Sequence, residues 1–420
     1  DNLFLRGTAS KQVTQLTVDA HPEDSSARNA AATRAIDMEY ETRDPERPTP
    51  EIYWAPDASH FVAMRFKAGS QRRIYMVESS PKDQLQPRLL SFPYLKPGDA
   101  VPYAKPHLFD VAKRQEIPVA DTLFGNPWSV SDVHWWPDSS EFTFMFNQRG
   151  HQVMRILGVK AASGVVRPIV DEQSKTFICY SSKNFAEYLA ETGELIWMSE
   201  REGWNHLYLY DARTGKVKNQ ITRGNWVVRG VDRVDHEKRQ IWFRAGGMVP
   251  GQDPYYLQFC RVNFDGSGLT VLTEGDGTHS VQYSPDSRYL IDTYSRVDLP
   301  PVNDLRRADD GKLVCHLEES DASELAARNW QTPERFVAKG RDGVTDIYGV
   351  IFWPKDFDPK KKYPVLEDVY AGPQDSFVPK EFHLNYRNSA LTEHGFIVVQ
   401  ADGMGTSNRC QRTTHGDRST

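Results

Sequence analysis

Cysteine is scarce in this sequence, with only 4 residues in a chain of 420. The four are far apart, form no Cys-x-x-Cys pair and have no histidine at ligand spacing: Cys179, Cys260, Cys315 and Cys410. A zinc site is therefore not expected, and a disulfide framework needs a much higher cysteine content. We expect isolated buried thiols and predict neither a metal nor a cofactor.

Long apolar runs and excess positive charge are also missing. No run approaches the roughly eighteen apolar residues that a membrane-spanning helix needs, so we expect no membrane span in this chain. The net charge of −6 and the isoelectric point near 6.1 argue against nucleic acid or an anionic membrane as the main partner. The aromatic content of 11% instead favours β structure.

Both ends of the chain suggest a fragment of a longer protein. There is no initiator methionine, and Asp1-Asn-Leu-Phe-Leu5 already has the pattern of a strand. Residues 410–420 contain no aliphatic or aromatic side chain, so we expect an aberrant or disordered tail there. Because the sequence begins within a predicted strand, it does not show whether the protein has a signal peptide.

A hairpin unit recurs along residues 1–320. A short strand ends in an aromatic residue and a Pro-Asp turn, and a second apolar strand follows; the copies are residues 53–63, 135–144 and 283–291. Proline fixes φ, and the aspartate can bond back to the turn backbone. A second unit, in residues 207–217 and 261–271, closes on an acidic or glycine turn.

The spacing of these units predicts the fold class. A full cycle takes about 40–50 residues, which is the blade period of a propeller with four strands per blade. We therefore predict a mainly β protein with a multi-bladed β-propeller, incomplete at the N-terminus, with room for about six or seven blades. Residues 3–17 would supply the outer half of an incomplete first blade. The alternative, a β-sandwich, rarely holds so many strands.

Three segments depart from the repeat. Residues 20–49 are polar and predict a long loop or short helix, and residues 81–106, with six prolines, predict an irregular connection. Residues 318–329 have a helical composition and predict a crossing to the next domain. Residues 334–343 and 347–354 then predict an antiparallel hairpin that turns through Gly340 and Gly343.

Near the end of the chain, the pattern changes to strand, turn, helix, strand. Residues 364–369 and 396–401 are apolar runs of the kind found in strands buried on both faces of an α/β sheet. Between them, residues 388–395 predict a short helix that ends at Gly395. Ligands and catalytic groups lie at the strand-end loops of such sheets.

The same residues carry a family resemblance. Asp368-Val-Tyr-Ala-Gly-Pro373 and Asp402-Gly-Met-Gly-Thr406 resemble the opening motifs of the α/β-hydrolase domain in the dipeptidyl peptidase IV / prolyl oligopeptidase family of serine peptidases. That family places a β-propeller first, and residues 199–211 and 221–230 resemble blade sequences of its bacterial members. The resemblance implies a propeller over residues 1–325, the start of the hydrolase domain over 326–409, and the tail over 410–420.

The catalytic groups of such a peptidase are only partly present. Peptide hydrolysis by serine needs a nucleophile on a Gly-x-Ser-x-Gly turn, a histidine, a carboxylate and donors for the oxyanion. No Gly-x-Ser-x-Gly occurs in the chain, and Ser407 is expected to be a loop or cap residue. The resemblance places the family's Ser, Asp and His beyond residue 420, so the chain alone is predicted to be inactive. It also matches Tyr370 to the tyrosine whose hydroxyl stabilises the oxyanion.

Substrate recognition is assigned by the resemblance alone. Family members that remove dipeptides hold the peptide amino terminus with a pair of acidic propeller residues. In the segment before Tyr53, Glu39 and Glu41 are the candidates for this binding role, although the family's adjacent Glu-Glu is missing.

Two functions remain open from the sequence. In the first, the chain is part of a serine exopeptidase of the dipeptidyl or prolyl type, in which the propeller restricts access and binds peptide substrate. Its full-length form would be a candidate homodimer, and the resemblance favours the periplasm or the outside of the cell. In the second, the chain is a non-catalytic propeller scaffold that binds a peptide or protein.

Overall fold

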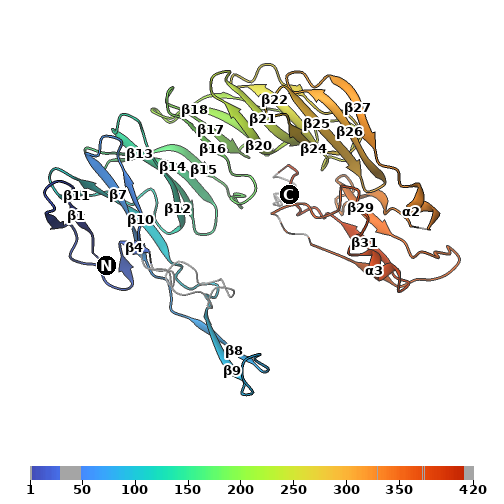
Figure 1. The fold of residues 1–420 in the computed structure, drawn as a ribbon, viewed down its shortest axis with the longest axis horizontal. Coiled ribbons are helices and arrows are strands. Elements are labelled where there is room, and N and C mark those ends of the chain that lie inside the picture. Colours follow the sequence, from blue (N-terminus) through green and yellow to red (C-terminus); the bar gives the residue numbers. More distant parts are fainter. Residues whose placement is uncertain (1, 29–48, 329, 371, 373, 411–420) are drawn as a thin grey trace. The chain divides into compact units, whose positions relative to one another are not determined.

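The computed structural model describes residues 2–28, 49–328, 330–370, 372 and 374–410. They belong to two compact units, Asp1–Ile178 and Cys179–Thr420. Strands dominate both units (Figure 1), and the described residues contain two short helices, α2 (Ser323–Ala327) and α3 (Ser389–Thr392). The mainly β fold class is thus confirmed. In the described part of the chain, no helix has the length and apolar character needed to span a bilayer.

In its described residues, 2–28 and 49–178, the first unit contains two large sheets and three two-stranded ones. Its strands are β1 (Phe4–Arg6), β2 (Val13–Gln15), β3 (Asp24–Ser25), β4 (Ala27–Arg28), β5 (Thr49–Pro50), β6 (Ile52–Trp54), β7 (His60–Lys67), β8 (Arg73–Glu78), β9 (Arg88–Pro93), β10 (Tyr103–Asp110), β11 (Gln115–Ile117), β12 (Pro127–Trp135), β13 (Glu141–Gln148), β14 (Val153–Lys160) and β15 (Val166–Gln173). The β12–β15 blade is an antiparallel meander, and the other large sheet has the order β11-β10-β7-β3, with β6 also paired to β7.

Apolar faces of these two sheets cover each other. Val62 and Leu108 of the β7–β10 sheet are in one buried cluster with Phe144 and Leu157 of the β12–β15 blade. On the opposite face of β7, the β1–β2 hairpin contributes Leu3 to a second cluster. Because strand side chains alternate between faces, each sheet needs a neighbour on both sides.

The Pro-Asp turns have the geometry that the sequence predicts. The residue after each Pro-Asp is left-handed, with φ of 57° at Ala58, 57° at Ser139 and 55° at Ser287. The aspartate side chain accepts a backbone N–H two residues on in all three turns, for example from Ser59 to Asp57 at 2.9 Å. These turns join β6 to β7, β12 to β13 and β24 to β25.

The second unit contains three more blades and a C-terminal sheet. Its strands are β16 (Ala186–Leu189), β17 (Glu194–Ser199), β18 (His206–Asp211), β19 (Lys216–Gln220), β20 (Val227–Asp235), β21 (Gln240–Gly246), β22 (Leu257–Asn263), β23 (Thr270–Val271), β24 (Thr278–Tyr283), β25 (Tyr289–Arg296), β26 (Leu299–Arg307), β27 (Leu313–Glu319), β28 (Glu334–Lys339), β29 (Asp346–Phe352), β30 (Val365–Glu367) and β31 (Ile397–Ala401). The β16–β19, β20–β23 and β24–β27 blades are four-stranded meanders.

Neighbouring blades of this unit also share buried clusters. Ile196 and Leu209 of the β16–β19 blade pack with Phe243 and Val262 of the β20–β23 blade. On the other face of β21, Trp242 packs with Leu290 of the β24–β27 blade. Each blade therefore stabilises the next through its apolar face.

The C-terminal sheet has the order β28-β29-β31-β30, in which β30 and β31 are parallel. The predicted hairpin of β28 and β29 is confirmed, as is a short helix, α3. The helix ends at Thr392 rather than at Gly395, which lies in the following turn with a φ of 82°. β30 is not buried on both faces as expected, because it is an edge strand that exposes 61% of Val365. Val398 of β31 is fully buried, in a cluster that also holds Val297 from the β25–β26 turn of a blade.

Other expectations need correction. The described residues hold five sheets of blade size before α2 rather than six or seven, because residues 68–102 form the β8–β9 hairpin and its connections. The predicted irregular connection includes β9 and the start of β10, where Pro106 is tolerated because β11 pairs only from Leu108 onward. Cys179 and Cys260 are buried thiols as expected, whereas Cys315 is exposed on β27.

An acid-sensitive contact links two blades. Glu194 of β17 is 3% exposed and accepts hydrogen bonds from Arg239, at 2.8 Å, and from Lys218. Burial alone would raise the pKa of the Glu194 carboxyl, but these two cations outweigh it and lower the pKa to about 2.

The lowered pKa predicts how stability depends on pH. A depressed carboxyl pKa contributes stability above its ordinary value of 4.5, and this stability is lost as the pH falls toward about 2. In urea titrations from about pH 5 to about pH 2, Glu194→Gln should lower the free energy of unfolding most at the upper end. The exposed Glu191→Gln is the control. Parallel pH curves for Glu194→Gln and the unmodified chain would contradict the prediction.

Candidate functional site at the end of the parallel strands

Two polar groups follow the parallel strands at the same sheet edge. Tyr370 comes three residues after β30 and Asp402 directly follows β31. The Asp368 N–H donates to the Val399 carbonyl at 2.9 Å, which extends the pairing beyond β30. Because carboxyl ends of parallel strands meet at one edge, this is where an α/β sheet places its functional groups.

Tyr370 presents its phenol to solvent. The side chain is 58% exposed, and its ring packs on Phe377 with 4.1 Å between the ring centroids. Within the described residues, its hydroxyl makes no hydrogen bond. A phenol held in this way can donate a hydrogen bond to an incoming group.

Asp402 forms hydrogen bonds with the backbone of Phe377 and Val378, the segment against which the Tyr370 ring packs. Its fully buried carboxylate accepts the N–H of Phe377 at 2.8 Å and the N–H of Val378 at 3.2 Å. Burial raises the pKa of this carboxyl, although the Phe377 hydrogen bond opposes the rise. Gln400 adds a hydrogen bond to the Phe377 carbonyl at 3.0 Å. Both backbone polar groups of Phe377, its N–H and its carbonyl, are therefore hydrogen-bonded, which restrains the residue on which Tyr370 packs.

The β20–β23 blade reaches this segment through the loop between β21 and β22. Lys380 donates to Asp253 at 2.7 Å, and its ammonium lies 4.8 Å from the centre of the Tyr255 ring. Arg409 donates to the Tyr255 hydroxyl and, at 2.8 Å, to the Asp346 carbonyl. Burial raises the pKa of Tyr255 to about 12, so this phenol stays protonated at neutral pH.

A second contact comes from β20. The guanidinium of Arg229 lies 3.5 Å from the Asp375 carboxylate, and burial lowers the pKa of Arg229. Asp375 also accepts a hydrogen bond from Asn408 at 2.9 Å. The blade thus places a largely covered cation, with 17% of its side chain exposed, beside the residues that follow Tyr370.

Only some of the residues singled out from the sequence lie in the part of the chain that the structure describes. Glu39 and Glu41 lie outside the described residues, so their binding role stays a prediction. Ser407 is 1% exposed in the loop after β31, and its N–H donates to the Asp375 carbonyl at 3.3 Å. A buried hydroxyl in such a loop is not an accessible nucleophile, in agreement with the sequence prediction. In the described residues, no group of three or more His, Cys, Asp or Glu is placed to hold a metal ion.

Sequence reasoning missed the supporting residues. Asp402 belongs to a motif that carries the family resemblance but had no assigned role, and Tyr255, Lys380 and Arg409 were not singled out. A signal was available for Asp402 only, because an aspartate directly after a buried strand needs backbone donors. The other three act through contacts between residues more than 100 positions apart.

Blades of four strands, followed by a mixed sheet with polar groups at its strand ends, define a propeller joined to an α/β sheet. A sequence model described as the dipeptidyl peptidase IV (DPP IV) N-terminal region matches residues 1–301. The chain belongs to this family. This match, together with the blade-sized sheets, confirms the predicted β-propeller.

Known proteins resemble the chain over nearly its whole length. It is 24% identical to a "Probable dipeptidyl-aminopeptidase B" of Coccidioides posadasii, over 97% of this chain and 45% of the relative. A protein of the same description from Penicillium rubens is 25% identical over 97% of this chain and 46% of the relative. The chain therefore spans about half the length of the curated relatives it matches.

A solved structure shows the same fold. The crystal structure of Porphyromonas gingivalis dipeptidyl peptidase 4 superposes with a TM-score of 0.71 and 23% identity, covering 98% of this chain and 56% of that one.

The role of Asp402 can be tested by its removal. Asp402→Ala leaves the buried Val378 N–H and the partly buried Phe377 N–H without their acceptor; for a fully buried N–H this costs about 1–3 kcal/mol. We expect a lower free energy of unfolding in urea and faster hydrogen exchange at Phe377 and Val378. The exposed Asp356→Asn is the control. Unchanged exchange at both amides would show that Asp402 does not hold this segment.

Proposed function

We propose that the chain forms the propeller and the start of the catalytic domain of a serine exopeptidase of the dipeptidyl or prolyl type. The observation that carries the proposal is Tyr370: its phenol is exposed at the end of β30, unpaired within the described residues and braced by Phe377. The family match over residues 1–301 supports the proposal from the propeller side.

Tyr370 would act on the oxyanion. When a serine attacks the scissile carbonyl, negative charge develops on the carbonyl oxygen, and a rigidly placed donor stabilises that charge. The Asp402 carboxylate keeps the Phe377 backbone in place, so the phenol needs little reorganisation as the charge forms.

The nucleophile would have to come from outside these 420 residues. The sequence has no Gly-x-Ser-x-Gly, and Ser407 is buried. The chain alone is therefore proposed to be inactive, and the propeller to restrict access and bind the peptide. Glu39 and Glu41 remain the proposed partners of the substrate amino terminus. Export to the periplasm or beyond the cell, and a homodimer in the full-length protein, belong to the same proposal.

The test is hydrolysis of Gly-Pro and Ala-Pro chromogenic peptides. The 420-residue chain and a version extended through a Gly-x-Ser-x-Gly turn are assayed side by side, and activity is expected only in the extended version. Activity in the 420-residue chain would mean that the nucleophile lies within it. If neither version is active while both bind proline-containing peptides, the chain is instead a binding scaffold.

The oxyanion role of Tyr370 predicts a kinetic signature in the extended protein. Tyr370→Phe should lower kcat by about 100- to 1000-fold and leave KM nearly unchanged, because the donor acts mainly in the transition state. The control is Tyr75→Phe, an exposed tyrosine on β8. A Tyr370→Phe enzyme with normal kcat would remove this residue from the catalytic machinery.

A further inference from the structure

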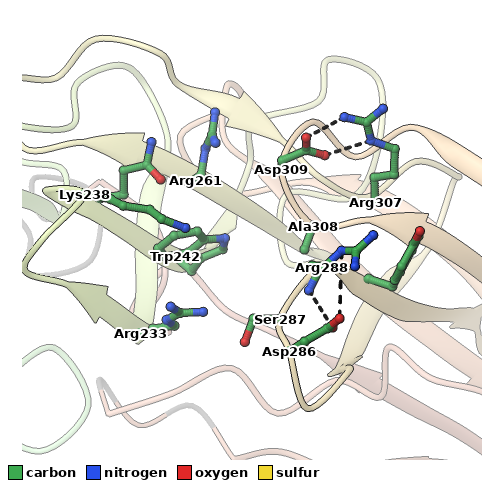
Figure 2. Close-up of a pocket in the computed structure, with 12 residues that line it drawn as sticks. Arg233, Lys238, Trp242, Arg261, Asp286, Ser287, Arg288, Arg307, Ala308 and Asp309 are labelled. Carbon is green, nitrogen blue, oxygen red and sulfur yellow. Dashed lines mark hydrogen bonds and ion pairs between the residues drawn. The ribbon is translucent and has the colours of Figure 1, made fainter.

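A basic cleft lies between the β20–β23 and β24–β27 blades. Its volume is about 490 Å³, and Figure 2 shows the side chains that line it. One wall consists of Arg233, Lys238 and Arg261 beside Trp242; the other carries Arg288. The volume is typical of a small-molecule site and is larger than a single inorganic ion needs.

The charge of the lining is opposite to that of the protein. Five of the lining side chains are cationic and two are carboxylates, in a chain whose net charge is −6: Arg233, Lys238, Arg261, Arg288 and Arg307 against Asp286 and Asp309. Two carboxylates outside the lining also pair with these cations: Asp235 lies 3.1 Å from Arg233, and Asp310 lies 3.4 Å from Arg307. Such a concentration of cations in a concave site attracts anions.

The two carboxylates do not neutralise the whole cleft. Arg307 pairs with Asp309, and Arg288 lies 3.8 Å from Asp286. Arg261 and the Lys238 ammonium, in contrast, have no carboxylate partner within the described residues. The Nε of Arg261 is buried and lacks a hydrogen-bond acceptor there. A buried donor without an acceptor is costly, and a bound anion would satisfy it.

The cleft and the C-terminal sheet contact opposite ends of the β24–β27 blade. The β25–β26 turn contributes Val297 to the cluster of the C-terminal sheet, and Asp298 of the same turn pairs with Arg335 at 3.0 Å. The cleft is lined by the β24–β25 and β26–β27 turns, through Ser287 and Asp309. In an antiparallel meander, alternate turns lie at opposite ends.

We propose that this cleft binds a small anion that carries several phosphate groups. Guanidinium forks match phosphate oxygens in bidentate geometry, and Lys238 and Arg261, which have no carboxylate partner in the described part of the chain, would contribute positive charge toward such a ligand. The ligand would contact both walls and thereby bridge two blades. This site is independent of the peptidase proposal.

The experiment uses isothermal titration of the full chain with tripolyphosphate, inorganic phosphate and citrate at low salt. We expect one tripolyphosphate per chain, bound at least about tenfold more tightly than citrate or inorganic phosphate. The double variant Lys238→Gln/Arg261→Gln should raise the Kd of tripolyphosphate about tenfold or more, since each substitution removes a charge-assisted contact with the ligand.

The control carries the same change of net charge elsewhere. Lys216→Gln/Lys360→Gln removes two exposed lysines outside the cleft, and tripolyphosphate should bind this variant as it binds the unmodified chain. Melting temperatures without ligand check that each variant folds; if Arg261→Gln disturbs folding, the exposed Arg288→Gln replaces it. Equal loss in both double variants, undiminished binding in the cleft variant, or absence of saturable binding would each overturn the proposal. Citrate binding as tight as tripolyphosphate would overturn the phosphate assignment.

Discussion

Side chains of a strand alternate between the two faces of its sheet, so a blade with apolar residues on both faces has two apolar surfaces to bury. Here neighbouring sheets bury them. Phe243 and Trp242 are adjacent on β21 and point to opposite sides, one into the cluster with the β16–β19 blade and the other into the cluster with the β24–β27 blade. The apolar burial that stabilises each blade also fixes its orientation toward the next. The packing of the blades therefore also positions the turns at their ends, which carry polar side chains such as Asp253 and Asp298.

The C-terminal sheet depends on one such set of turns. Val297 of the β25–β26 turn enters its apolar cluster, while Asp253 and Tyr255 of the β21–β22 loop bind Lys380 and Arg409. Lys380 lies two residues after Val378, in the segment that Asp402 holds. The segment against which the Tyr370 ring packs is thus linked to the β20–β23 blade through partly buried polar contacts.

Local patterns in the sequence predicted local structure well. The Pro-Asp turns, the β28–β29 hairpin and the left-handed Gly395 in the turn after α3 follow from backbone preferences of few residues, which the sequence shows directly. The exposure of β30 could not be predicted in this way, because an apolar run does not reveal whether its strand lies at a sheet edge. The same limit applies to the candidate site: Tyr370 was proposed from a motif, whereas the Lys380–Asp253 pair could not be predicted, because its two residues are 127 positions apart. The basic cleft was missed because its five cations come from three strands and two turns of two blades.

Whether the blades fix the C-terminal sheet is tested most directly by a double-mutant cycle on Lys380 and Asp253. Their side chains are 13% and 9% exposed, and the contact between them is 2.7 Å. Urea unfolding of Lys380→Gln, Asp253→Asn and the double variant gives the coupling free energy. Direct contact predicts a coupling of about 1 kcal/mol or more. Additive effects of the two single substitutions would mean that this contact does not hold the sheet against the blade.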